Sequence, residues 1–177
     1  IHECGGRVLN LLAKGSENHC RIQLRKEPEQ HFSDVCREIE RAGKMGLSVN
    51  VYLEDWSNGM ADSFSYVVAF LRRLAEMEVE RVMLPDTLGI LTPEQVTRYL
   101  DWVYSAVPGL RLDFHGHNDY GLVTANSLAA VKAGVNGIHV TVNGLGERTG
   151  NQSLAQLVVA INDHTDRETR VVEKELL

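Results

Sequence analysis

The 177-residue sequence has few cysteines and no long apolar segment. Its three cysteines, Cys4, Cys20 and Cys36, are odd in number and form no CxxC pair, so we expect free thiols rather than disulfides or structural zinc. No apolar run approaches the roughly 20 residues that a membrane helix needs, and the opening IHECGG has no signal-peptide pattern. We therefore expect a cytoplasmic protein with no membrane partner.

Clustered basic charge is also missing. The formal net charge is −6, and the longest basic cluster is the pair Arg72 and Arg73. Because binding to a phosphate backbone normally needs a basic patch, we expect no nucleic-acid partner. The rest of the composition, 44% hydrophobic and 24% charged, is typical of a globular domain, and no linker divides it. Residues 1–177 are therefore predicted to form a single segment of one domain.

One pattern recurs along the chain: a short apolar or alternating run, a turn, and a stretch with helical spacing of apolar residues. It predicts five strands, each leading into helical sequence, at residues 8–13, 47–54, 80–85, 111–117 and 137–143. Thr92 is a candidate N-cap that forms a capping box with Gln95, and Gly134 marks a helix end. Repeated βα units imply an α/β fold with a parallel sheet.

The alternation along the strands favours a barrel over an open sheet. Three strands alternate apolar residues with polar ones, and the polar members are Asn50, Tyr52, Glu54, Asp113, His115, His117, His139, Thr141 and Asn143. A sheet covered by helices on both faces would read as a near-continuous apolar run. The polar face therefore predicts a barrel interior. Since an eight-stranded barrel takes about 250 residues, we expect a partial (β/α)8 barrel.

Two histidines form the clearest candidate metal site. His115 and His117 are two residues apart on a predicted strand, so both imidazoles project to the same side. Neutral imidazole is the commonest protein ligand of a divalent transition metal, although an exposed or hydrogen-bonded histidine pair is the alternative. Asn118 and Asp119 follow directly and are candidates to orient the imidazoles by hydrogen bonds.

Other strand ends carry further candidates. Glu54 faces the predicted interior as a candidate general base, or else is a salt-bridged carboxylate at the rim. Thr87, in LPDTLG, offers a hydroxyl to a substrate carboxylate or caps the next helix. The segment GLGERTGN brings Glu147, Arg148 and Asn151 to a glycine-rich turn, where they can bind one another, a carboxylate or a metal. Its glycines alternatively serve only to close a tight loop.

Three segments together resemble one enzyme family, the acetyl-CoA-dependent 2-oxo acid synthases. They are VNVYLEDWSNG, RVMLPDTLGILTPEQV and DFHGHNDYGLVTANSLAAVKAGVNGIHVTVNGLGERTGN, and the similarity runs over nearly the whole chain. This family includes the isopropylmalate, citramalate and homocitrate synthases and shares its barrel with 3-hydroxy-3-methylglutaryl-CoA lyase. The resemblance implies a divalent metal (Zn, Mg or Mn) on His115 and His117, with Asn151 as a direct or water-mediated further ligand.

The family pattern also shows what this sequence lacks. The last metal ligand of the family is an aspartate in a DxTLRDGEQ-like motif on the first strand, beside an arginine, and the sequence contains no such motif. By this comparison the five strands look like strands four to eight, with the first three βα units missing. We therefore expect the segment alone to have little or no turnover.

The resemblance implies an acyltransferase that condenses acetyl-CoA with a 2-oxo acid and then hydrolyses the thioester. Glu54 would deprotonate acetyl-CoA, and Thr87 would hold the substrate carboxylate. Tyr52 and Leu12 would narrow the pocket, which favours pyruvate, and so citramalate, over the isopropylmalate reaction. A homocitrate synthase, a lyase that cleaves the carbon–carbon bond, and an inactive binding fragment remain open. Beyond the two small-molecule substrates, we expect a homodimer.

Overall fold

The computed structural model describes residues 2–176, which form one parallel sheet with the strand order β1-β2-β3-β4-β5. The strands are β1 (Val8–Lys14), β2 (Ser48–Glu54), β3 (Arg81–Asp86), β4 (Leu112–Gly116) and β5 (Gly137–His139). Each strand pairs with the next one along the chain, so the order never reverses as it does in a doubly wound sheet. The predicted α/β fold with five parallel strands is confirmed, and its topology is that of part of a barrel wall.

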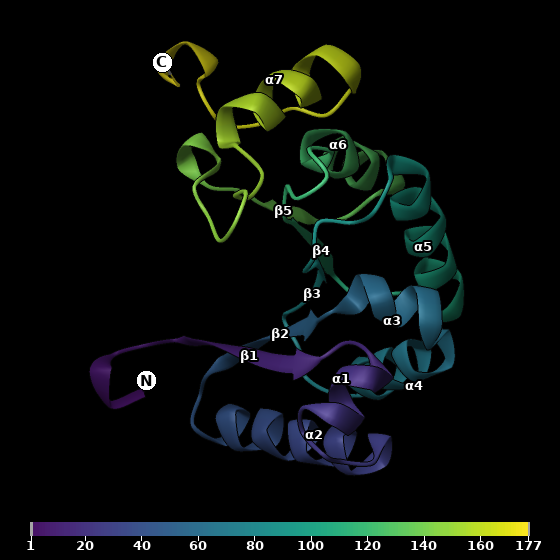
Figure 1. Ribbon diagram of the computed structural model, residues 1–177. Helices are drawn as coiled ribbons and strands as arrows, with labels where there is room; N and C mark the ends of the chain where they lie inside the picture. The colour runs from purple at the N-terminus through teal and green to yellow at the C-terminus, as the bar shows by residue number, and fades with distance from the viewer. Residues whose placement is uncertain (1, 177) are drawn as a thin grey trace.

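The helices lie along the outer side of this wall (Figure 1). They are α1 (Glu17–Ile22), α2 (Pro28–Lys44), α3 (Trp56–Asp62), α4 (Phe64–Ala75), α5 (Pro93–Ala106), α6 (Val123–Ala133) and α7 (Leu154–His164). Three short 3-10 turns complete the elements: η1 (His2–Cys4), η2 (Val142–Gly144) and η3 (Glu173–Glu175). In Figure 1 the row of strands from β1 to β5 follows an arc, and within residues 2–176 no helix covers the inner side of that arc. The sheet therefore has a covered outer face and an open inner face.

The core fills the space between the outer face and the helices. The outward side chains predicted for β2 and β4 are all buried, namely Val49, Val51, Leu53, Leu112 and Phe114. Phe32 of α2 stacks on Phe70 of α4, with ring centroids 4.4 Å apart. The inward residues Asn50, Tyr52 and Glu54 are only partly buried. The predicted alternation is thus confirmed on β2, whereas in β4 the inward residue Asp113 is buried together with its outward neighbours.

The prediction for the last strand is wrong beyond His139. The Thr141 N–H donates to the carbonyl oxygen of Gln152 (2.9 Å), so the backbone pairs with the returning loop instead of extending β5. Asn143 has a left-handed conformation (φ 58°) inside η2, and Val142 is exposed. Neither residue therefore continues the inward and outward alternation of the strand.

The helix ends predicted at Thr92 and Gly134 are confirmed. Thr92 Oγ1 accepts the Gln95 N–H and Gln95 Oε1 accepts the Thr92 N–H, which is the predicted capping box. Gly134 ends α6 in a left-handed conformation (φ 100°). The three cysteines are free thiols. In the part of the chain that the structure describes, no helix has the length and apolarity to cross a membrane.

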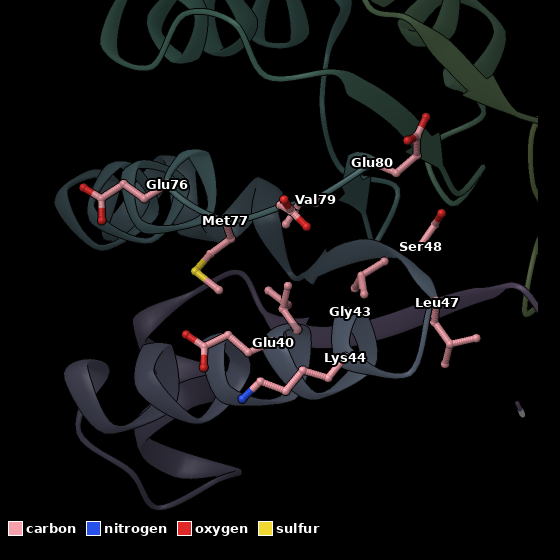
Figure 2. A pocket seen from close by; sticks show the side chains of 12 residues that line it. Glu40, Gly43, Lys44, Leu47, Ser48, Glu76, Met77, Val79 and Glu80 are labelled. Atoms are coloured by element: carbon pink, nitrogen blue, oxygen red, sulfur yellow. The ribbon is translucent and has the colours of Figure 1, made fainter.

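A cavity of about 730 Å³ opens between α2 and α4, near the beginnings of β2 and β3 (Figure 2). Glu40 and Lys44 of α2 and Glu76, at the end of α4, line it. The amino-terminal ends of barrel strands typically serve stability, whereas chemistry collects at the carboxyl-terminal ends. None of the predicted site residues lines this cavity. Glu54, Thr87 and His115 instead lie at the opposite, carboxyl-terminal ends of β2, β3 and β4.

Candidate active site

His115 and His117 lie side by side where β4 ends. Their Nε2 atoms are 3.3 Å apart. Zinc binds imidazole nitrogen at about 2.0–2.1 Å, so two nitrogens on one tetrahedral ion are separated by about 3.3 Å. The predicted pair therefore comes together with the spacing of two ligands of a single cation.

Asn151 reaches the same place from the glycine-rich loop. Its backbone bridges to His117, and its Nδ2 lies 3.4 Å from Nε2 of His115 and donates to the Gly116 carbonyl oxygen (3.2 Å). The amide oxygen faces Gly146, where an added Cβ would lie 1.9 Å from it. Binding a cation through this oxygen therefore requires a half-turn of the carboxamide. Within residues 2–176 no three His, Cys, Asp or Glu side chains are grouped so that they could hold a metal ion.

Burial favours the neutral form of both imidazoles. It lowers the pKa of His115 to about 4, and the neighbouring His139 and His117 act in the same direction. Burial also lowers the pKa of His117, with Arg148 as the next cause. Nδ1 of His117 is buried and has no hydrogen-bond partner among the described residues. Because a metal binds the neutral imidazole, this pair is in the binding form at neutral pH.

Asn118 and Asp119 do not orient the imidazoles as predicted. Asn118 Oδ1 accepts the Val123 N–H at the start of α6. Asp119 binds Arg148 through two hydrogen bonds of 2.7 and 2.8 Å, and this pairing lowers the pKa of Asp119. Arg148 also donates to the carbonyl oxygen of Thr87 (2.8 Å), so it ties the glycine-rich loop to the ends of β3 and β4.

Glu54 forms an ion pair with Lys14. Lys14 was not predicted as a site residue. The two residues stand opposite each other in the register of β1 and β2, and both side chains are partly buried. The structure thus shows the salt-bridged form of this carboxylate. Lys14 contacts Oε2, which leaves Oε1 to interact with another group.

The predicted substrate-binding residues are spread around the histidines. The Tyr52 hydroxyl lies 3.3 Å from Nδ1 of His139. Leu12 is the register partner of Tyr52 on β1 and is 62% exposed. Thr87 Oγ1 accepts the Asp55 N–H (2.8 Å) and does not cap α5, whose cap is Thr92. Of these three residues, only Tyr52 makes a hydrogen-bond contact in the histidine cluster.

His139 completes the cluster and was not predicted as a site residue. It is the register partner of His115, and the Nδ1 atoms of the two rings are 3.3 Å apart. Its Nε2 lies 3.7 Å from Asp113 Oδ2, and Asp113 also accepts from Arg81. The sequence predicted only that His139 lies on the inner face, from the alternation of apolar and polar residues along its strand. Its contact with His115 depends on the register between β4 and β5, which a single strand does not reveal.

The family model described as HMGL-like matches residues 2–176. The chain belongs to the HMGL-like family. A probable 2-isopropylmalate synthase of Methanopyrus kandleri is 38% identical over 156 residues, which are 88% of this chain and 30% of that protein. A homocitrate synthase of Saccharolobus solfataricus is 35% identical over 159 residues, 90% of this chain and 34% of that protein. The chain thus spans about a third of the curated relatives that it matches.

Solved structures show the same fold. A hydroxymethylglutaryl-CoA lyase from Pseudomonas aeruginosa superposes with a TM-score of 0.84 at 24% identity, over 98% of this chain and 61% of the lyase. An HMG-CoA lyase from Acinetobacter baumannii, in complex with coenzyme A and 3-methylmalate, gives 0.77 at 24% identity, over 99% of this chain and 60% of that one. The family resemblance read from the sequence motifs is confirmed.

Proposed function

We propose that this chain carries part of a metal-dependent acyltransferase site that condenses acetyl-CoA with a small 2-oxo acid. The supporting observation is the 3.3 Å separation of the His115 and His117 Nε2 atoms, on the same inner face as Tyr52 and Glu54. The synthases among the sequence relatives support this reaction class. The coenzyme A complex of a structural relative supports the co-substrate.

The five strands correspond, in this proposal, to strands four to eight of a (β/α)8 barrel. The 61% of the lyase chain that residues 2–176 span fits five βα units of eight. The open inner face and the unpaired outer edge of β1 are where strands one to three would complete the wall. Residues 1–177 are then a single catalytic-barrel segment, and the aspartate ligand would come from the first strand.

Three side chains would hold the cation: His115 and His117 through Nε2, and Asn151 through its amide oxygen. When bound, a divalent cation (Zn, Mg or Mn) supplies Lewis-acid polarisation of a keto oxygen. Glu54 takes a proton from the acetyl methyl group on Oε1, while Lys14 fixes Oε2. The enolate carbon then bonds to the keto carbon, whose oxygen gains a proton, and water cleaves the thioester to release coenzyme A.

The substrate is held and selected by residues around this centre. Because Thr87 Oγ1 accepts from Asp55, its own proton is free to bind a substrate carboxylate. Tyr52 presents its ring beside His115 and His139, and Leu12 extends the same wall. These bulky side chains favour the methyl group of pyruvate and hence citramalate synthesis. An added methylene is worth only about 1–3 kcal/mol, so the branched substrate of isopropylmalate synthesis is the nearest competitor.

The test uses the full-length protein that contains this chain, loaded with Zn, Mg or Mn in turn. Coenzyme A release is measured with pyruvate, 2-oxoisovalerate and 2-oxoglutarate, and the products are identified. We expect pyruvate to give the highest kcat/KM. Glu54→Gln should lower turnover by about 10²–10⁴-fold, the usual contribution of a general base. Glu40→Gln, in the cavity between α2 and α4, is the matched control and should leave the rate of coenzyme A release unchanged.

Each outcome separates one reading from another. Faster turnover with 2-oxoisovalerate or 2-oxoglutarate would replace the citramalate assignment with the isopropylmalate or homocitrate type. Cleavage of a 3-hydroxyacyl-CoA without condensation would indicate the lyase reaction. If no substrate releases coenzyme A, the remaining interpretation is that the chain is an inactive binding fragment. The 177-residue chain assayed alone should have little or no turnover, and activity equal to that of the full-length protein would refute the split of the site between barrel halves.

A further inference from the structure

A row of polar side chains crosses the inner face from β3 to β5 and ends on His115. Arg81 Nη1 donates to the two carboxylate oxygens of Asp113 at 2.8 and 3.0 Å. Asp113 Oδ2 lies 3.7 Å from His139 Nε2, and His139 Nδ1 lies 3.3 Å from His115 Nδ1. This row approaches His115 from the side opposite its Nε2 atom, which faces His117.

The sheet register builds this row. Asp113 is the register partner of Gly137, and His115 is the partner of His139. A Cβ at Gly137 would lie 2.7 Å from Asp113 Oδ1, so the absence of a side chain there makes room for the carboxylate. Asp113 is buried, and Arg81 compensates its charge. The carboxylate is therefore held firmly next to His139.

The proton positions along the row follow from metal binding. A neutral imidazole has one N–H donor and one acceptor nitrogen, so a His115 that binds a cation through Nε2 carries its proton on Nδ1. That proton faces Nδ1 of His139, which must then be an acceptor. His139 consequently carries its own proton on Nε2, where it faces the Asp113 carboxylate. The Tyr52 hydroxyl also lies 3.3 Å from this Nδ1, whose single lone pair it would share with the His115 N–H.

We propose that His139 is a positioning residue that fixes the tautomer and ring orientation of His115 for cation binding, with Asp113 and Arg81 holding His139 in turn. This inference rests on the proposed function, because it assumes that His115 binds a metal. Partners that accept the second N–H of a metal-binding histidine typically contribute about 10–100-fold to metal affinity. Asn118 and Asp119, the partners expected from the sequence, are engaged elsewhere.

The experiment measures cation affinity directly and not turnover. The full-length protein that contains this chain, and so all the proposed ligands, is titrated with Mn²⁺ alone, followed by electron paramagnetic resonance, and with Co²⁺ alone, followed by its visible absorption. His139→Phe keeps an aromatic ring beside Tyr52 but removes the acceptor, so Kd should rise by about 10–100-fold. His139→Asn returns an acceptor oxygen near the position of Nδ1 and should recover most of the affinity. His164→Phe, at an exposed position at the end of α7, is the control.

Folding and function are checked separately. Circular dichroism and urea unfolding show whether each variant folds, and the pair of Phe and Asn variants keeps the test valid if one of them does not. If His115→Ala abolishes binding while His139→Phe binds like the unmodified full-length protein, the role of His139 is overturned and the proposed function stands. Equal losses in His139→Asn and His139→Phe would also overturn it, because they would indicate packing alone. Failure of the unmodified full-length protein to bind either cation would reject both proposals.

Discussion

Histidines on the two faces of the same sheet have different contacts. Beneath the outer face, His31 is buried, accepts the Lys14 N–H through Nε2 (3.0 Å) and packs edge-on against Phe70, with centroids 5.3 Å apart. On the inner face, His115 contacts both His117 and His139. Burial lowers the pKa of His31 as it does that of His115. A depressed histidine pKa therefore does not mark a site here; the convergence of several donors on one point does.

The largest difference between the faces should appear in stability. Phe114 points outward and is 0% exposed, whereas Leu12 points inward and is 62% exposed. Truncating a buried phenylalanine removes apolar contacts and leaves a cavity, so Phe114→Ala should lower the free energy of unfolding by about 3–5 kcal/mol. Leu12→Ala should stay within about 0.5 kcal/mol of the unmodified chain. Urea unfolding followed by circular dichroism measures both, and similar losses at the two positions would break the comparison.

A smaller effect is expected where the glycine-rich loop meets the inner face. Gly146→Ala would place a Cβ 1.9 Å from Asn151 Oδ1, so the amide must move. Such overpacking typically costs about 1–3 kcal/mol of stability. We also expect weaker Co²⁺ binding, because Asn151 leaves its place beside His115. Gly43→Ala in α2, where an added Cβ meets nothing within 4 Å, is the control. Unchanged cation binding in Gly146→Ala would argue against Asn151 as a ligand.

The outer face could be predicted from the sequence because its rules are local. Alternation with a period of two places Val51 and Leu53 against the helices whatever lies beside them in the sheet. The capping box of Thr92 and Gln95 is likewise contained within four residues. The family motifs brought His115, His117 and Asn151 into one prediction for the same reason: each motif is a contiguous segment.

The inner face was predicted only in part because its contacts join separate strands. The pairs Lys14 with Glu54 and His115 with His139 depend on the register between neighbouring strands, and 40 and 24 residues separate the partners in sequence. The connections between the strands help to set that register, and alternation within one strand does not reveal it. The end of β5 was missed for a similar reason, since the Thr141 N–H is taken by Gln152 of the returning loop.

The smallest effect concerns acid sensitivity and separates the two histidine environments. Burial, with the nearby charge of Lys26, lowers the pKa of folded His31 below its ordinary value of 6.5. Below about pH 6.5 the unfolded chain therefore binds a proton that the folded chain refuses, so the free energy of unfolding falls as pH decreases. Above that pH the contribution of His31 is complete and constant.

His31→Gln tests this assignment because glutamine does not titrate in this range yet keeps an acceptor oxygen for the Lys14 N–H. Urea unfolding between about pH 7 and pH 5 should show a shallower loss of stability in His31→Gln than in the unmodified chain. His164→Gln, at the exposed end of α7, should keep the original slope. An unchanged slope in His31→Gln would mean that groups other than His31 carry the acid sensitivity. His115 and His117 on the inner face, whose pKa values are also lowered by burial, would be the next positions to substitute.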